Sequence, residues 1–311
     1  DYDELSGEIK KIWKKLHRVL EDIGERSKST SPNSQLSPPS SNGLKSNLSQ
    51  ADYTERVEKA KNYIREGDIY QANLAQKFET PFAGCSFQLY KKLMQVNPSP
   101  FSGYLNFSNF SLVSSSPERL VKVHEHRIET RPIAGTRPRG QTHEEDERLA
   151  AELRESEKEQ REHLMVLERM ERLLQQFCRK TERLSYLELL GLKHVQHLQS
   201  RVQGILQADI SDSDLLPSFH PTPAVSGTPD PEARALIRKL EPFDRGWYAG
   251  PVGWISSSQA EFAVGIRSGL LCGRTLRIYT GAGIVDGSVP EEEWREIEDK
   301  LQSWQYLLGR T

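Results

Sequence analysis

The chain has 311 residues, a length that suits one large domain or two small ones. Its hydrophobic content of 36% and charged content of 28% are typical of a soluble globular protein, and no apolar run approaches the ~20 residues needed to span a bilayer. A net charge of −2 argues against a general nucleic-acid surface. The three cysteines have no metal-like spacing, so we expect a reducing compartment, either the cytoplasm or, in a plant, the plastid stroma.

Two segments are expected before the main domain. Apolar residues from Leu5 to Ile23 recur at three- and four-residue steps, which predicts an amphipathic helix over residues 1–26. Residues 27–50 are rich in Ser, Pro and Asn, which predicts a disordered linker. Because the chain starts at Asp1 rather than at Met, we expect this helix to be the remnant of a longer N-terminal portion. The main domain is then expected over residues 51–311.

A helix from Ser49 to Gly67 and a strand over residues 69–75 are expected to open this domain. Alternation along the strand places Gln71 and Asn73 on the same face. A polar pair that faces the interior is costly unless its hydrogen bonds are satisfied. These two side chains therefore form either the wall of a site or the solvent side of an edge strand.

An antiparallel meander is predicted from four short segments, near residues 102–107, 110–115, 119–123 and 126–131. Glu118 lies at a turn inside this meander. The segment 131–140 follows and carries three arginines and two glycines, which indicates either an anion-binding loop or a basic surface turn.

The second half of the chain mixes helices and strands without a regular βαβ order. A helix is predicted over residues 144–177, and its pattern alone indicates that Glu162 and His163 are solvated. His197 lies in a later strand, where a structural histidine is more common than a catalytic one. A Pro- and Gly-rich loop at 219–227 precedes a helix and three strands, near residues 231–240, 251–256, 262–271 and 275–281. Together these elements predict an α+β fold with antiparallel sheets.

An apolar strand from Leu276 to Tyr279 is predicted to lead into the stretch from Gly281 to Lys300, which predicts a Gly-rich turn and a helix with Ser288 as its N-cap. On that helix Glu293, Glu296 and Lys300 share one face. Two carboxylates and an ammonium beside a glycine loop suit a divalent ion with an anionic ligand, and hard oxygen ligands suit Mg²⁺. A capped surface helix with solvated charges is the alternative.

Seven motifs resemble, in order, those of the chorismate-utilising enzymes, at residues 67–71, 115–118, 131–136, 158–163, 194–198, 266–268 and 281–300. That family includes anthranilate synthase component I, aminodeoxychorismate synthase component I, isochorismate synthase and salicylate synthase. The resemblance implies an α/β sandwich built on antiparallel sheets with flanking helices. It also implies that residues 51–311 form a chorismate-binding catalytic domain.

The resemblance assigns roles to individual residues. In this family a nucleophile adds to the chorismate ring, the ring hydroxyl leaves, and Mg²⁺ holds a substrate carboxylate. Glu162 and Glu296 match metal-ligand positions, and Glu293 lies on the same helix face as Glu296. Glu118 matches the general acid for the departing hydroxyl, and Arg267 matches a clamp for a substrate carboxylate. Other pocket positions are matched by Gly135, Thr136, His197, Tyr248, Gly281 and Lys300, and His197 has either an acid–base or a positioning role.

Gln71 bears on the choice of nucleophile. Isochorismate-forming members of the family carry a lysine at this position, which acts as the general base on water. A glutamine side chain has no basic nitrogen, whereas neutral ammonia needs no base to become a nucleophile. The resemblance therefore favours an ammonia-using synthase, which implies a separate glutamine amidotransferase subunit as a partner. Aminodeoxychorismate synthases commonly carry a nucleophilic lysine where this chain has Ala134, so the resemblance favours anthranilate synthase or an atypical aminodeoxychorismate synthase.

The two halves of the chain resemble different branches of the family. Residues 220–225, 244–254 and 261–267 are similar to isochorismate synthase, and the two patterns meet near residues 162–170. Our leading hypothesis is Mg²⁺-dependent amination of chorismate. The alternatives are isochorismate formation by water addition and an inactive protein that only binds chorismate. We expect neither a nucleic acid nor a membrane as a partner.

Overall fold

The structure is a computed structural model that describes residues 43–208, 210 and 212–309. The helix expected over residues 1–26 and most of the expected linker lie outside the described residues. The end of that linker was predicted wrongly, because Lys45–Ser46 (β1) pair with the neighbouring strand β2 (Gln71–Pro81). Leu48 is buried beside them, and its carbonyl accepts a hydrogen bond from the Gln76 amide.

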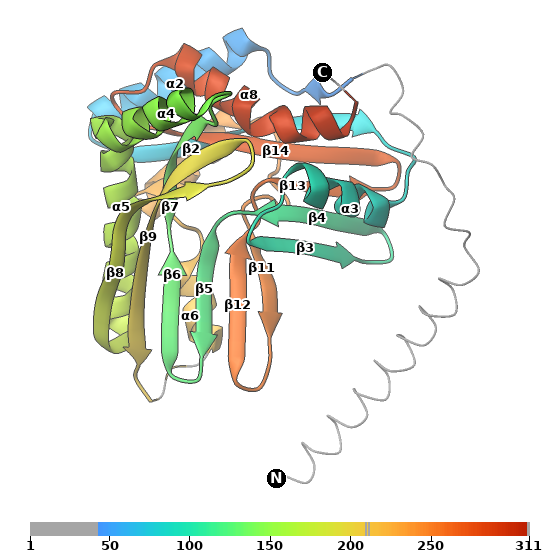
Figure 1. Ribbon diagram of the computed structural model, residues 1–311. Coiled ribbons are helices and arrows are strands. Elements are labelled where there is room, and N and C mark those ends of the chain that lie inside the picture. The colour runs from blue at the N-terminus through green and yellow to red at the C-terminus, as the bar shows by residue number, and fades with distance from the viewer. Residues whose placement is uncertain (1–42, 209, 211, 310–311) are drawn as a thin grey trace, which may run out of the picture. The chain divides into compact units, whose positions relative to one another are not determined.

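Two antiparallel sheets form the framework, which confirms the predicted α+β class. The first has the order β1-β2-β14-β13-β4-β3, with β10 also paired to β2. Its further members are β3 (Phe101–Asn106), β4 (Phe110–Ser116), β10 (Gly227–Thr228), β13 (Ser268–Cys272) and β14 (Thr275–Ile284). In Figure 1 its long strands β2 and β14 run across the view, at the level of the label β14.

The second sheet has the order β11-β12-β5-β6-β9-β7, with β8 also paired to β9. Its strands run down the view in Figure 1, across the direction of β2 and β14. They are β5 (Arg119–His124), β6 (Arg127–Arg131), β7 (Ile133–Pro138), β8 (Cys178–Gly191), β9 (Val195–Leu206), β11 (Pro251–Ile255) and β12 (Gln259–Val264).

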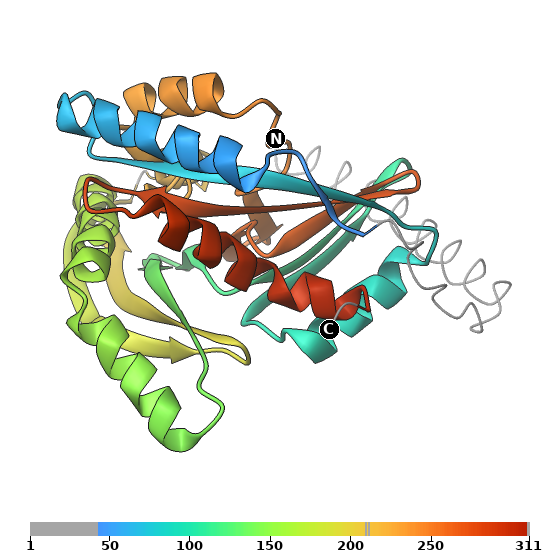
Figure 2. The ribbon, with the colours of Figure 1, turned by 90° about the horizontal axis from the view of Figure 1, so that it is seen from above.

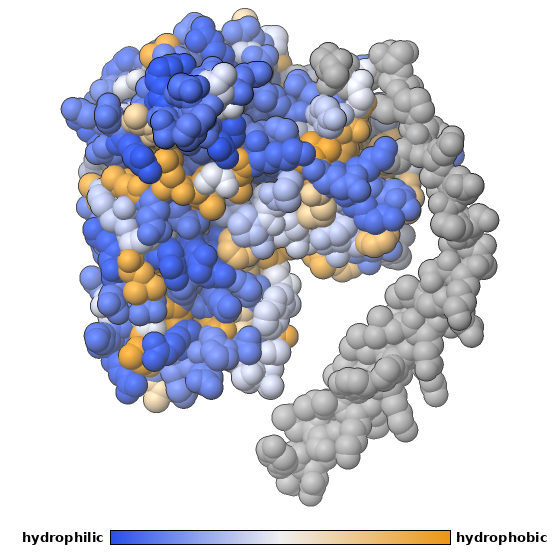
Figure 3. Space-filling model, in the orientation of Figure 1, coloured by the Kyte–Doolittle hydropathy of each residue, from blue (hydrophilic) through white to orange (hydrophobic). Residues whose placement is uncertain are grey.

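Helices cover both sheets. The first sheet contacts α2 (Gln50–Arg65), α3 (Ser86–Val96), α7 (Asp230–Leu240) and α8 (Pro290–Leu307). Figure 2 shows α2 and α8 lying along β2 and β14. The second sheet contacts α4 (His143–Glu155), α5 (Glu157–Phe177) and α6 (Asp212–Phe219). On the face shown in Figure 3, hydrophilic side chains cover the outer sides of α4 and α8, as expected for helices that bury one side. No helix in the described part of the chain is long and apolar enough to cross a membrane.

The chain crosses between the two sheets at two places that the sequence analysis missed. The predicted meander is in fact divided, because β3 and β4 belong to the first sheet whereas β5 and β6 belong to the second. Pro117, at the break between β4 and β5, has no N–H to offer a sheet ladder. The strand predicted over 262–271 is likewise two strands in different sheets, β12 and β13. Arg267 lies between them with a positive φ of 52°, a conformation that a regular strand does not contain.

Hydrogen bonds hold the two crossings side by side. The amide of Val264 donates to the carbonyl of Glu118 at 3.1 Å, and the amide of Ser115 donates to the carbonyl of Arg267 at 3.3 Å. The Ser116 hydroxyl also donates to the carbonyl of Val264, at 2.6 Å. Two segments that lie about 150 residues apart in the sequence are thereby brought together at the junction of the sheets.

Two of the predicted helices are also corrected. The helix predicted over 144–177 is interrupted at Ser156, which ends α4 and whose hydroxyl accepts from the amide of Glu159 at the start of α5. Residues 281–284 are the end of β14 rather than a turn, and Val289 is the N-cap residue of α8. The Ser288 hydroxyl accepts instead from the amide of Val285.

Strand β2 is central rather than an edge, which decides between the two interpretations of Gln71 and Asn73. It pairs with β14 over ten residue pairs and with β1 and β10 on its other side. Gln71 is 0% and Asn73 is 4% exposed, whereas Tyr70, just before the strand, is 62% exposed. The two polar side chains therefore belong to the interior, and the solvent-face interpretation was wrong.

Candidate active site

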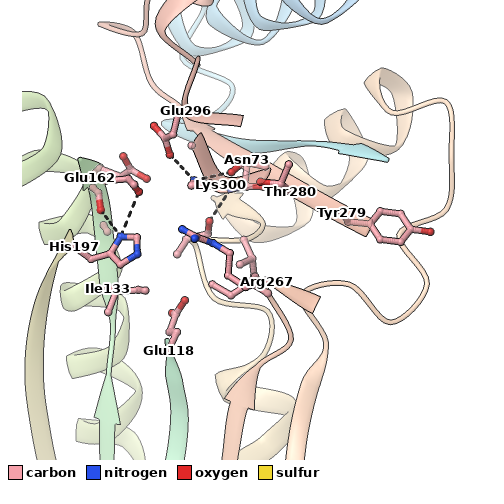
Figure 4. A pocket seen from close by; sticks show the side chains of 18 of the residues that line it. Asn73, Glu118, Ile133, Glu162, His197, Arg267, Tyr279, Thr280, Glu296 and Lys300 are labelled. Carbon is pink, nitrogen blue, oxygen red and sulfur yellow. Dashed lines mark hydrogen bonds and ion pairs between the residues drawn. The ribbon is translucent and has the colours of Figure 1, made fainter. Parts of the chain in front are cut away.

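A cavity lies where the two sheets, α5 and α8 meet (Figure 4). Of the twelve positions that the sequence analysis assigned to a site, ten line it: Glu118, Gly135, Thr136, Glu162, His197, Tyr248, Arg267, Gly281, Glu296 and Lys300. The figure shows Glu296 and Lys300 reaching in from α8, Glu162 from α5 and Glu118 from the start of β5. The other two are also buried: Gln71 lies beside Glu162, which lines the cavity, and Glu293 forms an ion pair with Lys158.

The helix side of the cavity concentrates carboxylates. Burial raises the pKa of Glu162 well above its ordinary value, and the neighbouring Glu159 and Glu296 reinforce the effect. For Glu296 burial acts in the same sense, but its ion pair with Lys300 prevails and lowers its pKa. Glu293 pairs with Lys158 at 2.5 Å, and its second oxygen, Oε2, is buried without a hydrogen-bond partner. A cation near Glu162 would relieve this repulsion.

We tested whether these carboxylates fit a metal ion. Among the described residues, no three His, Cys, Asp or Glu side chains converge in the manner of a protein-only metal site. Mg²⁺, however, keeps several waters and often takes only one or two protein carboxylates. Glu162 and Glu296 both line the cavity, and the hydrogen-bond donor to Glu162 is the neutral side-chain amide of Gln71, at 3.4 Å. This donor set fits Mg²⁺ together with a substrate carboxylate.

On the strand side of the cavity, burial shifts the pKa values of the ionisable groups. Glu118 is 2% exposed, and burial raises its pKa to about 8 although the charge of Lys300 acts against the shift. Its carboxyl group is therefore protonated near neutral pH and can donate a proton. Arg267 is 8% exposed, and although burial lowers its pKa to about 10 it remains a cation at neutral pH. The crossings described above place both residues here.

His197 is held as a neutral imidazole. Its Nδ1 lies 2.8 Å from the carbonyl oxygen of Gly135, and because a carbonyl only accepts, Nδ1 carries the proton. Burial lowers the pKa of His197 to about 3, and the charge of Arg267 adds to this effect. Its Nε2 is buried without a partner. The ring therefore offers a hydrogen-bond acceptor to a ligand in the cavity.

Glycines in β14 allow the cavity wall to approach its polar groups closely. A Cβ at Gly283 would lie 2.4 Å from Glu162 Oε1 and 2.9 Å from Gln71 Nε2. A Cβ at Gly281 would lie 2.4 Å from Asn73 Oδ1. Any side chain at these positions would displace the site groups, which explains why this stretch reads as glycine-rich although it is a strand.

Several site residues were missed from the sequence. Glu159 is 3% exposed and binds Arg137 at 3.0 Å, and Lys158 holds Glu293. Their spacing contained a signal, because residues 159, 162, 163 and 166 share one helix face with the apolar stripe. The anion-loop interpretation of residues 131–140 is not supported, because its arginines pair with carboxylates of the chain, Glu129, Glu159 and Asp146.

A cavity that brings together titratable groups with shifted pKa values, here carboxylates on one side and a cation on the other, is the usual form of an enzyme active site. The chain belongs to the chorismate binding enzyme family, whose model matches residues 4–306. It is 41% identical to anthranilate synthase component 1 of Saccharolobus solfataricus over 267 residues, which are 84% of this chain and 63% of that protein.

Two solved structures are similar in fold. Anthranilate synthase component I from Streptococcus pneumoniae superposes with a TM-score of 0.81 at 30% identity, and covers 95% of this chain and 66% of its own. The menaquinone-specific isochorismate synthase from Escherichia coli superposes with a TM-score of 0.81 at 31% identity, and covers 90% of this chain and 65% of its own. Both branches expected from the motifs are thus represented, and the match to anthranilate synthase extends through both halves of the chain. The chain spans slightly less than two thirds of these proteins.

Proposed function

We propose that this chain aminates chorismate with ammonia in a Mg²⁺-dependent reaction, as the activity of an anthranilate synthase component I would require. The observation that carries the proposal is Gln71, which is fully buried and donates to Glu162 at 3.4 Å. A lysine there would supply a base for water next to the cavity, whereas glutamine supplies only a neutral amide. The nucleophile must then be one that needs no such base, and ammonia meets that condition.

In the proposed reaction, three residues of the cavity have separate roles. Arg267 holds a substrate carboxylate through its planar guanidinium. Glu118, protonated near neutral pH, gives its proton to the ring hydroxyl as the C–O bond breaks, so that water leaves while the C–N bond forms. The added nitrogen returns a proton to solvent or to the Glu118 carboxylate. His197 Nε2 accepts a hydrogen bond from the substrate or from ammonia and fixes its position.

Mg²⁺ would be held by Glu162 and Glu296. When bound, it supplies positive charge that neutralises a substrate carboxylate and orients the ring. The ion pair of Lys300 with Glu296 keeps that carboxylate ionised, as a ligand requires. We further propose that a separate glutamine amidotransferase subunit delivers the ammonia, which a high ammonium concentration replaces in vitro.

A second candidate is isochorismate synthase, favoured by the motifs of the C-terminal half and by the similarity to the Escherichia coli enzyme. The two candidates are separated by incubating the chain with chorismate and Mg²⁺, with and without ammonium, and analysing the products by mass spectrometry. We expect an aminated product only with ammonium. Isochorismate formed without ammonium would reject the amination proposal in favour of the second candidate.

Variants at position 71 make the assay sharper. Gln71→Lys should gain isochorismate formation without ammonium, because a lysine amine can take a proton from water. Gln71→Met is the matched control, since it fills a similar volume and offers neither a base nor a hydrogen bond. If both variants gave the same products, position 71 would not set the nucleophile. Absence of turnover in every variant, together with chorismate binding by calorimetry, would identify a binding protein.

A further inference from the structure

A buried ion pair supports the part of the cavity wall that strand β2 and the loop at 222–226 form. Glu241 follows the end of α7, and Arg245 lies four residues later. The Arg245 guanidinium donates from Nε to Glu241 Oε2 at 2.8 Å and from Nη2 to Glu241 Oε1 at 2.5 Å. The Arg245 side chain is 18% exposed and the Glu241 side chain is 4% exposed, so the pair is largely removed from water.

The other hydrogen bonds of the pair are formed with backbone groups of the cavity wall. Arg245 Nη2 donates to the carbonyl of Asn73 at 2.6 Å, and Nη1 donates to the carbonyl of Val225 at 2.5 Å. Glu241 Oε1 accepts from the amide of Ala75 at 2.7 Å. Asn73 in turn donates from its side chain to the carbonyl of Ala224 at 2.8 Å. Asn73, Ala224 and Val225 all line the cavity.

We infer that Arg245 and Glu241 are positioning residues, which fix strand β2 and the loop at 222–226 at the separation that the substrate requires. A buried ion pair is weak evidence for added stability, because desolvation of both charges offsets their attraction. This pair instead joins two segments that lie about 150 residues apart. Among the described residues, neither member of the pair forms a hydrogen bond or ion pair with the cavity's carboxylates or with Arg267, so the pair acts through the wall it holds.

A second cavity, of about 600 Å³, lies on the far side of the pair. Arg245 and Glu241 line it, and it shares Val225 and Tyr248 with the first cavity. The pair therefore forms part of the partition between the two. A small cation that enters the second cavity can reach the place of a deleted Arg245 side chain, which gives the inference a direct test.

The test measures chorismate binding by calorimetry with Mg²⁺, and hydrogen exchange of residues 73–75 and 224–226, in Arg245→Ala. We expect chorismate affinity to fall about 10²-fold, the scale of a 1 Å misplacement in a site, and exchange to rise at both segments. Millimolar guanidinium chloride should restore most of the affinity and protection, whereas sodium chloride at equal ionic strength should not. Arg245→Met is the matched variant that guanidinium cannot rescue, because the methionine fills the space.

Two further variants serve as a negative control and as a conservative alternative to Arg245→Ala. Arg277→Met removes an ion pair with Glu79 in the same sheet, away from the cavity, and should change neither readout. Glu241→Gln is nearly isosteric and should weaken binding about tenfold, so it serves if Arg245→Ala does not fold. Unchanged exchange at residues 73–75 and 224–226 in a folded Arg245→Ala or in Glu241→Gln would overturn the inference, as would equal rescue by sodium chloride.

The inference rests on the proposed function only for its choice of probe. If the wild type does not bind chorismate, the proposed function fails, and the exchange measurements with guanidinium still decide whether the pair holds the wall. If the wild type binds chorismate and exchange does not respond to the variants, the inference fails and the proposed function stands.

Discussion

The two sides of the cavity differ in how their buried ionisable groups are accommodated: on one side most are ion-paired, and on the other most are neutral. On the helix side, three carboxylates are partnered by cations of the chain: Glu159 by Arg137, Glu293 by Lys158 and Glu296 by Lys300. Glu162 lies among them without such a partner in its hydrogen bonding, and its pKa is raised. On the strand side, Glu118 and His197 are kept neutral by burial, and Arg267 is the fixed cation.

This difference indicates what each side binds. With Glu162 ionised, the four carboxylates of the helix side exceed its three cations by one charge. A divalent cation together with one substrate carboxylate would balance that charge, so we propose that this side takes the metal. The strand side offers a proton donor, a neutral acceptor and a guanidinium, which suit the leaving hydroxyl and a second carboxylate. Predictions that alter one side at a time can break or sharpen this division.

The largest effect is expected for Glu162→Gln on the helix side. Loss of the proposed metal ligand should remove several kcal/mol of transition-state stabilisation, or about 10⁴-fold in rate. Without metal the variant should melt at a higher temperature than the wild type, because one buried carboxylate among several is neutralised. Added Mg²⁺ should raise the melting temperature of the wild type but not of the variant. A variant that keeps the full Mg²⁺ shift would show that Glu162 does not hold the ion.

The next effect concerns Glu118 on the strand side. Glu118→Gln should slow turnover about 10³-fold, because the amide cannot give a proton to the leaving hydroxyl. In the wild type the acid must be protonated, so turnover should decline as pH rises through about 8. The measurement is the rate of chorismate loss from pH 6 to about pH 10. A profile that stays flat through pH 8 would exclude Glu118 as the group that titrates.

The same raised pKa makes stability depend on pH with a defined sign. The pKa of Glu118 rises from its ordinary value of 4.5 to about 8 in the folded protein, so the folded state binds this proton more tightly than the unfolded chain does. Its contribution to stability is fully present below 4.5 and is lost as pH rises to about 8. Across that window this proton should lower the unfolding free energy by about 1.4 kcal/mol per pH unit. The difference between wild type and Glu118→Gln isolates the slope from that of the other buried carboxylates.

The sequence predicted some of this arrangement and missed the rest for identifiable reasons. The bounds of β3 to β6 and the burial stripe of α5 followed from local periodicity. Periodicity does not show which sheet a strand joins, so the crossings at Pro117 and near Arg267 were missed. Glu162 and His163 read as solvated because their helix is rich in exposed charge, yet His163 is 0% exposed and shares a hydrogen bond with Ser200 of β9.

Recognition of the motifs supplied what periodicity could not. Ten of the twelve assigned positions line one cavity, although several come from elements whose form was predicted wrongly, such as Gly281 in a strand rather than a turn. Glu159 and Arg245 lie in segments that resemble the family and Glu241 lies outside them, but none of the three was assigned a role in the predicted site. Their importance depends on long-range contacts, and the sequence of one chain does not display these.

The smallest effect is expected for Arg267→Lys, which keeps the charge and changes only its geometry. Arg267 has a backbone φ of 52° at the crossing between β12 and β13, so its side chain starts from a fixed and unusual direction. Lysine offers a point charge in place of a planar fork and should lose one of two charge-assisted hydrogen bonds to a carboxylate. That loss, about 1.5–3 kcal/mol, should appear as a roughly 10- to 100-fold rise in KM with a smaller change in kcat, measured by steady-state kinetics with ammonium. The Mg²⁺-induced melting shift should remain as in the wild type, because Arg267 lies on the strand side. If that shift fell together with chorismate affinity, the two sides would not be independent, and the cavity would have to be treated as a single coupled charge network.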